Sequence, residues 1–575
     1  MTRTDGRPYE ANPTYPPSDG LVVGGWPAAV ATLPDGPLRL AVDGPAVLDW
    51  PAVVGGIVNA LRVRGTSVEL SDMGANFLPW RRIVELTSTD RLRDDPDFAA
   101  LAEVDLATLF EAVPSADAGD GVRLVYGPGA ALAAHDVLWY ADLPKRHAEA
   151  AIVAGDARNL GQPPGEGTGT TRRLFYVDWP ILDRHRNAIA GEIDRWIDVQ
   201  LPVGPASIEW SSLARTLHDL ARRPFRTRPT FNTAAWGGHW GQRELGLSPD
   251  APNTGIGYEL IAPESGVLIG TPEARVEVPF ALAVTRFPDA ILGDEVHRAF
   301  GTSFPVRFDY LDTVDGSNLS VHCHPQAEYM RSVFGWPYTQ HESYYVMVGG
   351  TARQVFLGLR EDVDLAEFER AASGAVDDGH AFEIERFVQT YPAEPHQLFM
   401  IPAGTPHGSG KGNVVLEVSA TPYLYSLRFY DWLRRDADGR QRPVHVRHAF
   451  ANLDRERRGR AVGDDLVQAP RLLHAGEDWR EEVIGTLPEV FFEVRRYVLE
   501  PGACAEAATD GRFCVLNVVD GDGVTVETDA GDTHRLNYAE TMVVPAAVGG
   551  HRLRAVGTGP VRVVKAIVRP GSPVD

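Results

Sequence analysis

The sequence predicts a multidomain protein: an N-terminal α/β domain followed by two jelly-roll β-barrels, the first carrying a helical insert. Three observations predict this class. The chain has 575 residues, too many for one hydrophobic core. Strand-like and helix-like segments alternate in its first part, whereas short strands with frequent Gly and Pro dominate from about residue 225. We therefore expect domains at 1–222, 223–450 and 451–575.

The first elements have the strand–turn–helix order of an α/β layer. The apolar run "LRLAVDGP" (38–45) ends in a turn and is followed by the helix-like "DWPAVVGGIVNALRVRG" (49–65). A second strand-like segment, "TSVELSDM" (66–73), comes next. Strands that alternate with helices favour a mainly parallel sheet. Later in the chain, "DLAEFERAASGA" (364–375) is the helical insert expected within the first barrel.

Composition excludes several classes of function. The formal net charge of −23 argues against a basic surface for nucleic acid and against docking on an anionic membrane. The sequence has no apolar stretch of 18 residues, and its first twenty residues lack the apolar core of a signal peptide. Three cysteines give no disulfide framework. We expect a cytoplasmic protein that binds a small molecule.

A metal site is predicted by four residues on three segments. In "LSVHCHPQAEYM" (319–330), His322 and His324 are two residues apart on a predicted strand, so their side chains share a face. An isolated pair of this kind also fits a solvent-facing strand. Glu342 begins the next strand, and His407 enters another after the turn "IPAGTP". Three imidazoles and a carboxylate suit Zn²⁺ or another first-row divalent ion. The order HxH, Glu, His is that of the cupin double-stranded barrel.

The region from about 225 to 450 resembles type I mannose-6-phosphate isomerase, a zinc-dependent aldose–ketose isomerase built from two cupins. Six segments match in order: "AWGGHWG" (235–241), "TGIGYELIAPESG" (254–266), "FPVRFDYLDTVDGSNLSVHCHPQAEY" (304–329), "VFLGLREDVDLAEF" (355–368), "IPAGTPHGSG" (401–410) and "SLRFYDW" (426–432). The resemblance implies a C-terminal second cupin and a metal on His322, His324, Glu342 and His407. It also implies that Arg428 is an active-site arginine, and that mannose 6-phosphate and fructose 6-phosphate, or a related sugar, interconvert through an enediolate.

Three departures from the family concern the substrate. Asp309 and Gln340 stand where the family has lysines, and Leu424 stands where it has an aspartate. Phosphate recognition would then fall to arginines such as Arg307 or Arg353, or be absent, and the substrate could be an unphosphorylated sugar. A catalytically diverged metal- and sugar-binding regulatory protein is the alternative to an isomerase.

Isomerisation needs a base at C2, a proton donor at C1 and stabilisation of the enediolate oxygens. The metal and Arg428 would stabilise the developing negative charge. Asp309 and His396 are the candidates for the base, which must lie within hydrogen-bond reach of the proton it takes.

The N-terminal domain resembles P-loop proteins of the uridine-kinase type in degenerate form. Its strand–turn–helix segment lacks GxxxxGK[ST], so neither the lysine for the phosphates nor the hydroxyl for Mg²⁺ is present. We expect a role in packing or regulation rather than an active kinase. Asp43, Asp72 and Asp142 each follow a predicted strand and are the places for carboxylates if ligand binding persists.

Overall fold

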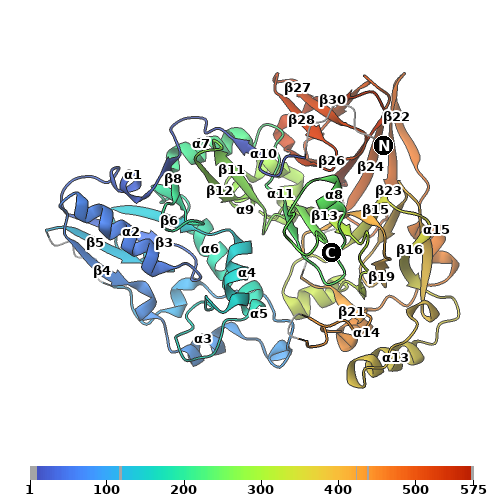
Figure 1. Cartoon of the computed structure of the whole chain (residues 1–575), viewed down its shortest axis with the longest axis horizontal. Helices are drawn as coiled ribbons and strands as arrows, with labels where there is room; N and C mark the ends of the chain where they lie inside the picture. Colours follow the sequence, from blue (N-terminus) through green and yellow to red (C-terminus); the bar gives the residue numbers. More distant parts are fainter. Residues whose placement is uncertain (1–8, 115–119, 423, 437–438, 572–575) are drawn as a thin grey trace.

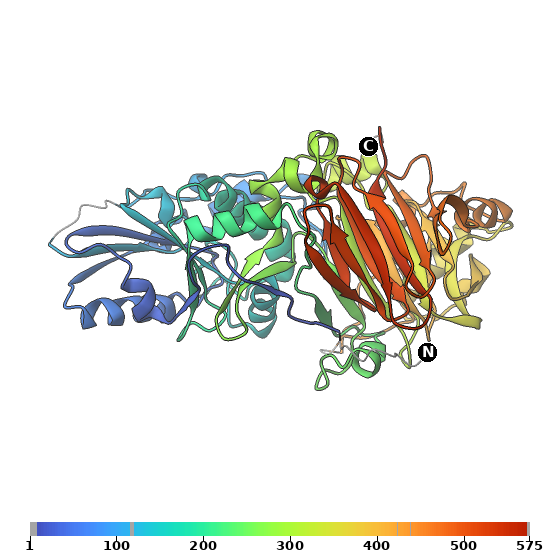
Figure 2. The ribbon, with the colours of Figure 1, turned by 90° about the horizontal axis from the view of Figure 1, so that it is seen from above.

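The computed structural model describes residues 9–114, 120–422, 424–436 and 439–571, so residues 1–8 of the N-terminal stretch lie outside the described part. An α/β region occupies one end of the molecule, and the later β-rich regions occupy the other (Figures 1 and 2). Among the described residues, no helix has the length and apolar character needed to span a membrane.

The N-terminal sheet has seven strands in the order β2-β8-β7-β6-β3-β5-β4. The five strands from β7 to β4 are parallel, as predicted, and β8 and β2 add antiparallel edges. The strands are β2 (Val23–Gly24), β3 (Leu38–Asp43), β4 (Val68–Asp72), β5 (Val122–Tyr126), β6 (Val137–Asp142), β7 (Arg195–Asp198) and β8 (Ala206–Glu209). The helices are α1 (Trp26–Val30), α2 (Trp50–Val63), α3 (Trp80–Thr87), α4 (Lys145–Ala154), α5 (Thr171–Arg173), α6 (Trp179–Ile189) and α7 (Trp210–Leu220).

Helix α2 shows how local sequence forms this layer. The Asp49 side chain accepts a hydrogen bond from the backbone N–H of Ala52 (3.0 Å) and so caps the helix. Val53, Ile57 and Leu61, spaced four residues apart, are buried and pack in the same apolar cluster as β3. Asp43, Asp72 and Asp142 are the last residues of β3, β4 and β6, the places that the sequence predicts for them.

Two antiparallel sheets form the first β-rich region. Their orders are β18-β15-β20-β13-β10-β9 and β17-β16-β19-β14-β21. The first contains β9 (Thr230–Asn232), β10 (Ile256–Leu260), β13 (Val306–Asp312), β15 (Glu342–Val348), β18 (Leu398–Ile401) and β20 (Val414–Ala420). The second contains β14 (Val321–Cys323), β16 (Gly350–Leu359), β17 (Val388–Ala393), β19 (His407–Ser409) and β21 (Leu427–Tyr430).

Short helices surround these sheets. They are α8 (Trp240–Glu244), α9 (Phe280–Arg286), α10 (Pro288–Leu292), α11 (Asp294–Phe300), α12 (Ala327–Tyr329), α13 (Leu365–Asp377) and α14 (Val446–Asn452). Helix α13 is the predicted insert, and the Asp364 side chain caps it by accepting from Glu367 N–H (3.0 Å). Its buried Phe368 packs with Phe429 of β21, so the insert covers the outer face of the second sheet.

A second pair of antiparallel sheets follows helix α15 (Arg460–Leu466). One contains β22 (Arg471–Ala475), β23 (Trp479–Gly485), β24 (Phe492–Leu499), β26 (Cys514–Asp520), β29 (Thr541–Val544) and β31 (Val561–Val568). The other contains β25 (Cys504–Ala508), β27 (Gly523–Thr528), β28 (Thr533–Asn537) and β30 (Gly550–Val556). The sequence predicts six of these strands, β24, β26, β27, β29, β30 and β31, from their apolar runs, whereas it does not predict β22, β23, β25 and β28.

The regions share packing across the predicted divisions. A small sheet joins β1 (Thr14–Tyr15) in parallel to the hairpin β11 (Gly266–Gly270) and β12 (Arg275–Pro279). Phe225 and Val543 exchange backbone hydrogen bonds of 3.0 and 2.8 Å. One apolar cluster includes Leu217, Phe280, Tyr310 and Val543, so α7, α9, β13 and β29 contribute to a common core.

Candidate metal centre

Strand pairing places the predicted ligands on one interior face. Strand β14 lies between β19 and β21, and its His322 is the direct partner of His407 on β19 and of Arg428 on β21. Residues that pair directly in antiparallel strands have their side chains on the same face. Glu342 approaches from the opposing sheet, as the first residue of β15.

The structure brings His322, His324, Glu342 and His407 together. One ligand atom from each lies within 4.8 Å of the others. Glu342 Oε2 is 2.5 Å from His324 Nε2 and 3.4 Å from His407 Nε2. His322 is 6% exposed, and the other three are at most 1% exposed. Among the described residues, these four form the cluster of His, Cys, Asp or Glu side chains whose geometry could hold a metal ion.

Backbone carbonyls orient all three imidazole rings. Each ring has its Nδ1 beside a carbonyl oxygen: His322 with Ser320 (2.9 Å), His324 with Tyr425 (3.3 Å) and His407 with Thr405 (2.9 Å). The Nδ1–H of His322 and of His407 therefore donates to the carbonyl, which leaves the Nε2 lone pair of these two rings for a ligand; the Nδ1 of His324 also lies 3.1 Å from the side-chain nitrogen of Gln340. A second hydrogen bond of this kind is the usual support for a metal-binding histidine.

The polar atoms at the centre fit a bound cation. Glu342 Oε1 and His407 Nε2 are buried and have no hydrogen-bond partner among the described residues. Leaving such atoms unpaired is costly, and an ion satisfies both. Burial and the neighbouring imidazoles lower the pKa of His322, and burial lowers that of His324. Although burial favours a neutral Glu342, His407 and His324 hold its pKa well below the usual range. Neutral imidazoles and an ionised carboxylate are the forms that bind a metal.

Asp309 lies inside the same barrel. It pairs with Tyr258 on one side and Glu417 on the other, and Glu417 pairs with Tyr344, so these four side chains form a row across the sheet. Burial raises the pKa of Asp309 to about 7; Arg307 opposes this shift and Glu342 adds to it. Asp309 Oδ1 has no hydrogen-bond partner within the described residues. Asp309 is therefore a carboxyl group beside the metal group with an oxygen available to a ligand.

Arg307 is held by its neighbours rather than presented to a phosphate. Its guanidinium donates to Glu417, donates to Ser419 Oγ (2.6 Å) and lies 3.3 Å from Asp309 Oδ2. Gln340 is beside it: with its amide oriented by these neighbours, it donates to His324 Nδ1 (3.1 Å) and to the Pro422 carbonyl (2.6 Å), and it accepts from Arg307 Nη2 (3.1 Å). The positions where the family has lysines thus contain an acid and a neutral amide within one polar network.

Arg428 is close to His322 through strand pairing, but its guanidinium points to another segment. Its Nη1 donates to the Pro443 carbonyl (3.1 Å), and its backbone N–H donates to His445 Nδ1 (3.2 Å). Burial and the nearby Arg442 lower its pKa to about 10. Between the described residues, no hydrogen bond joins it to the metal group. Leu424 presents its backbone carbonyl, which accepts from Tyr176 Oη (3.2 Å).

Two other predicted candidates lie elsewhere. His396 is 3.1 Å from Tyr345 Oη and 3.6 Å from Asp520 of β26. Because Tyr345 alternates with Tyr344 along β15, His396 is on the side of that strand away from the barrel interior. Arg353 lines a separate groove together with Lys411 and Arg434. The structure does not bring either residue to the metal group.

Sequence reasoning missed the partners of Arg307. Glu417 and Ser419 are two residues apart in "VVLEVSA" (414–420), an otherwise apolar strand. A single Glu at an interior-facing position of such a strand is the sequence signal that could have identified them. Nothing local pointed to the N-terminal segment that packs beside this barrel. There, the Phe98 ring packs against the His445 ring at a tilt (4.7 Å between ring centroids), and the Asp95 carboxylate is 2.7 Å from His448 Nε2.

Three buried histidines and one glutamate between two antiparallel sheets form a candidate metal-binding site. Comparison with known proteins identifies the following relatives of the chain. A family model described as "Domain of unknown function (DUF8485)" matches residues 25–222. The mannose-6-phosphate isomerase ManA of Bacillus subtilis (strain 168) is 22% identical over 261 residues, which are 44% of this chain and 73% of the relative. The probable mannose-6-phosphate isomerase GmuF of the same strain is 22% identical over 57% of this chain and 94% of its own length.

A further relative is the mannose-6-phosphate isomerase of Streptococcus mutans serotype c. It is 28% identical over 220 residues, 37% of this chain and 63% of that protein. Among solved structures, the mannose 6-phosphate isomerase from Bacillus subtilis aligns with a TM-score of 0.46 and 17% identity over 60% of this chain and 99% of the other. A zinc-bound mannose 6-phosphate isomerase aligns with a TM-score of 0.44 and 15% identity over 60% of this chain and 100% of its own.

Proposed function

We propose that the chain is a metal-dependent aldose–ketose isomerase that interconverts mannose 6-phosphate and fructose 6-phosphate, or a related sugar, through an enediolate. The observation that carries the proposal is the buried group of His322, His324, Glu342 and His407, with the unpartnered Asp309 oxygen in the same barrel. The relatives named mannose-6-phosphate isomerase support the reaction class.

A divalent ion held by these four residues, zinc in our proposal, would act as a Lewis acid toward the sugar oxygens. Asp309 would take the proton from C2 and return it to C1, because a carboxyl group with a pKa of about 7 exists in both forms near neutrality. Glu417, whose pKa burial raises although Arg307 forms an ion pair with it, would donate a proton toward a sugar oxygen. Arg428 would stabilise negative charge on the enediolate once its guanidinium turns from Pro443 toward the site.

Metal analysis and turnover test the proposal together. The purified protein is assayed for bound zinc and for conversion of mannose 6-phosphate and of free mannose. His324→Ala should bind metal at least about 100-fold more weakly and lose turnover. His396→Asn is the control, since this residue lies outside the barrel interior and its φ of 73° suits Asn. Full turnover by metal-free protein or by His324→Ala would refute the proposal.

The second candidate is a metal- and sugar-binding regulatory protein without turnover. Asp309, Gln340 and Leu424 favour it, because they replace three groups to which the family's mechanisms assign phosphate binding or proton handling. Metal-dependent binding of a sugar, without conversion of either substrate, would establish this candidate and exclude the isomerase.

We further propose that residues 1–222 form a degenerate P-loop-like domain without kinase activity, next to catalytic (223–450) and C-terminal (451–575) cupin domains. In the turn after β3, the Asp43 carboxylate accepts from the backbone N–H groups of Gly44 (2.7 Å), Gly129 (3.3 Å) and Ala131 (2.9 Å). Backbone amides gathered in this way ordinarily bind an anion. Here the chain's own carboxylate fills the place. Absence of ATP binding by the full chain, measured by calorimetry, tests this proposal.

We also propose a cytoplasmic location. Cys323, Cys504 and Cys514 are all free thiols, which fits a reducing compartment. Fractionation of cells that express the full chain tests the location.

A further inference from the structure

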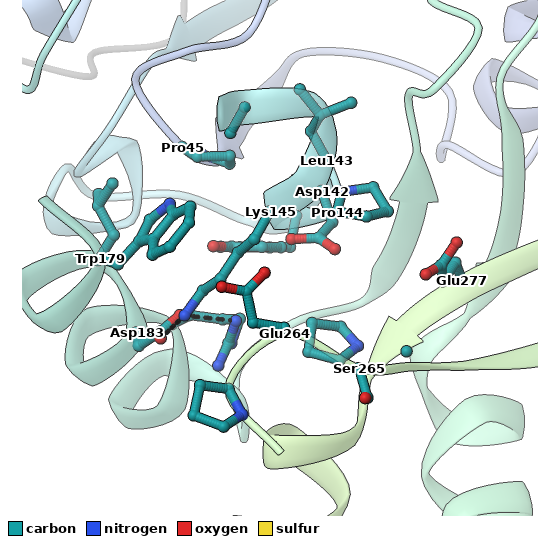
Figure 3. A pocket seen from close by; sticks show the side chains of 17 residues that line it. Pro45, Asp142, Leu143, Pro144, Lys145, Trp179, Asp183, Glu264, Ser265 and Glu277 are labelled. Atoms are coloured by element: carbon teal, nitrogen blue, oxygen red, sulfur yellow. Dashed lines mark hydrogen bonds and ion pairs between the residues drawn. The ribbon is translucent and has the colours of Figure 1, made fainter. Parts of the chain in front are cut away.

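A cavity lies between the α/β region and the first barrel, beyond the carboxyl end of β6 (Figure 3). Its volume is about 40 Å³. Asp142, Lys145 and Asp183 line it from the α/β side, and Glu264 and Glu277 line it from the barrel side. A neighbouring hollow of about 320 Å³ shares Lys145, Asp183, Arg186 and two other residues with it and adds Arg184, so its lining contains three cationic side chains and one carboxyl group. Together they offer room for a sugar-sized ligand with a narrow inner end.

The cations of the cavity are already paired. Lys145 Nζ is 2.7 Å from Asp183 Oδ2 and 4.7 Å from the centroid of the Trp179 ring. Arg186 Nη1 is 3.0 Å from Asp183 Oδ1. On the other wall, Glu277 binds two arginines that do not line the cavity. These are Arg146 and Arg228, each at 2.6 Å. The lining as a whole contains four carboxyl groups and two cationic side chains.

Asp142 is the unusual member of this lining. It is 5% exposed, and its Oδ2 has no hydrogen-bond partner among the described residues. Its carboxyl group and that of Glu264 both point into the cavity, from opposite walls (Figure 3). Burial raises the pKa of Asp142 to about 7, and the neighbouring acids Asp198, Asp183 and Glu277 add to the shift against Arg186. A buried carboxyl group without a partner is costly, so a ligand that donates a hydrogen bond is the natural complement.

Glu264 connects this cavity to the barrel interior. It follows β10, and its charge raises the pKa of both Tyr258 and Asp309, the interior row described above. The larger hollow reaches Thr421 and Leu424, on either side of Pro422, whose carbonyl accepts from Gln340. Gln340 precedes the proposed ligand Glu342 by two residues. The hollow, which borders Pro422 and so Gln340, therefore lies at the end of the barrel that contains the metal group.

We propose that the substrate reaches through the hollow, that its end remote from the metal group lies in the small cavity, and that Asp142 and Glu264, which line the cavity but not the hollow, select an uncharged hydroxyl-bearing end over a phosphate. The substrate class is then an unphosphorylated sugar. Carboxyl groups accept hydrogen bonds from sugar hydroxyls, whereas a phosphate dianion placed here meets two carboxyl groups in a poorly solvated cavity. At the two positions where the family has lysines this chain has Asp309 and Gln340, so these positions also offer no cation to a phosphate. This inference rests on the proposed isomerase and deepens it.

The test compares kcat/KM for free mannose and for mannose 6-phosphate, with the metal-loaded full-length protein. The native protein should prefer free mannose by at least about tenfold. Asp142→Asn and Glu264→Gln keep the side-chain size and remove a charge, so each should shift the preference toward the phosphate by about tenfold. The matched control is Glu527→Gln, which removes a carboxylate in the C-terminal sheet, where Glu527 pairs with Arg554 (2.9 Å). The control should leave the preference unchanged.

A preference for mannose 6-phosphate that neither variant alters would overturn the inference. If the native protein converts neither sugar, the proposed isomerase fails, and binding decides the subsite by itself. Calorimetric titration with mannitol and with mannitol 1-phosphate then gives the preference without turnover. Tighter binding of mannitol, relaxed by Asp142→Asn or Glu264→Gln, supports the subsite. Equal or tighter binding of the phosphate by the native protein refutes it.

Discussion

Asp142→Asn should stabilise the protein, and should do so more at pH 8 than at pH 5. Asp142 is 5% exposed, and burial raises its pKa from 3.8 to about 7. Because the pKa is raised on folding, stability from the neutral form is fully present below pH 3.8 and is lost as the pH rises to about 7. At 1.36 kcal/mol per unit, this shift corresponds to a loss of roughly 4 kcal/mol, of which about 3 kcal/mol falls above pH 5. Asparagine does not ionise and avoids this loss.

The assay is the apparent thermal midpoint of the native protein and the variant at both pH values. About 3 kcal/mol corresponds to roughly 6–12 °C for a region of 150–250 residues. Asp178→Asn is the contrast: burial raises its pKa only to about 6, its Oδ2 accepts from Asn159 (2.7 Å) and Leu160 N–H (3.1 Å), and Arg173 Nε lies 3.7 Å from its Oδ1. At pH 5 that substitution should destabilise the protein, because the new amide nitrogen meets one of these donors and the ion pair with Arg173 is lost. An Asp142→Asn variant whose gain is the same at both pH values would refute the reasoning.

Three further predictions concern the barrel and the segment beside it. Asp309→Asn should lower kcat by about 10²–10⁴-fold with metal still bound. In the native protein kcat/KM should rise with pH through an apparent pKa at or below about 7, because a bound cation favours the carboxylate. An unchanged pH profile in the variant would exclude Asp309 as the base. Saturating zinc at about 1,000 times its Kd should stabilise the native protein by about 4 kcal/mol in chemical denaturation, whereas His324→Ala should not respond, and equal stabilisation of both would place the metal elsewhere. Phe98→Ala should lower the free energy of unfolding by about 3–5 kcal/mol, because the ring is 3% exposed and packs between Phe334 and His445. Limited proteolysis should then cut the segment 90–102 faster. Unchanged cleavage would show that this contact does not hold the segment in place.

Strand alternation explains why the metal group could be predicted. His322 and His324 share a face whatever the partner strands are, since side chains two apart on a strand always do. Glu342 and His407 follow the two histidines in the sequence order of the cupin barrel, and in the structure both lie beside His322 and His324. Whether the four bind a metal stays a prediction. The parallel N-terminal sheet was predictable for a similar reason, because alternation of strands and helices leaves few other arrangements.

Contacts between distant segments were not predictable. Asp142 and Glu264 belong to different predicted domains, and no local pattern shows that their carboxyl groups line one cavity. The position of His396 likewise depends on which face of β15 its loop contacts, and the sequence does not contain that information. The hydrogen bond of Arg428 to Pro443 also depends on how a later loop folds back over β21.

The most direct measurement of the central claim is anomalous X-ray scattering at the zinc edge from crystals of the metal-loaded protein. A peak should appear among His322 Nε2, His324 Nε2, His407 Nε2 and the Glu342 carboxylate, at distances of about 2.0–2.2 Å. The same crystals of His324→Ala should lose it. A fully loaded native crystal with no peak among these four residues, or with its zinc bound elsewhere, would contradict the account.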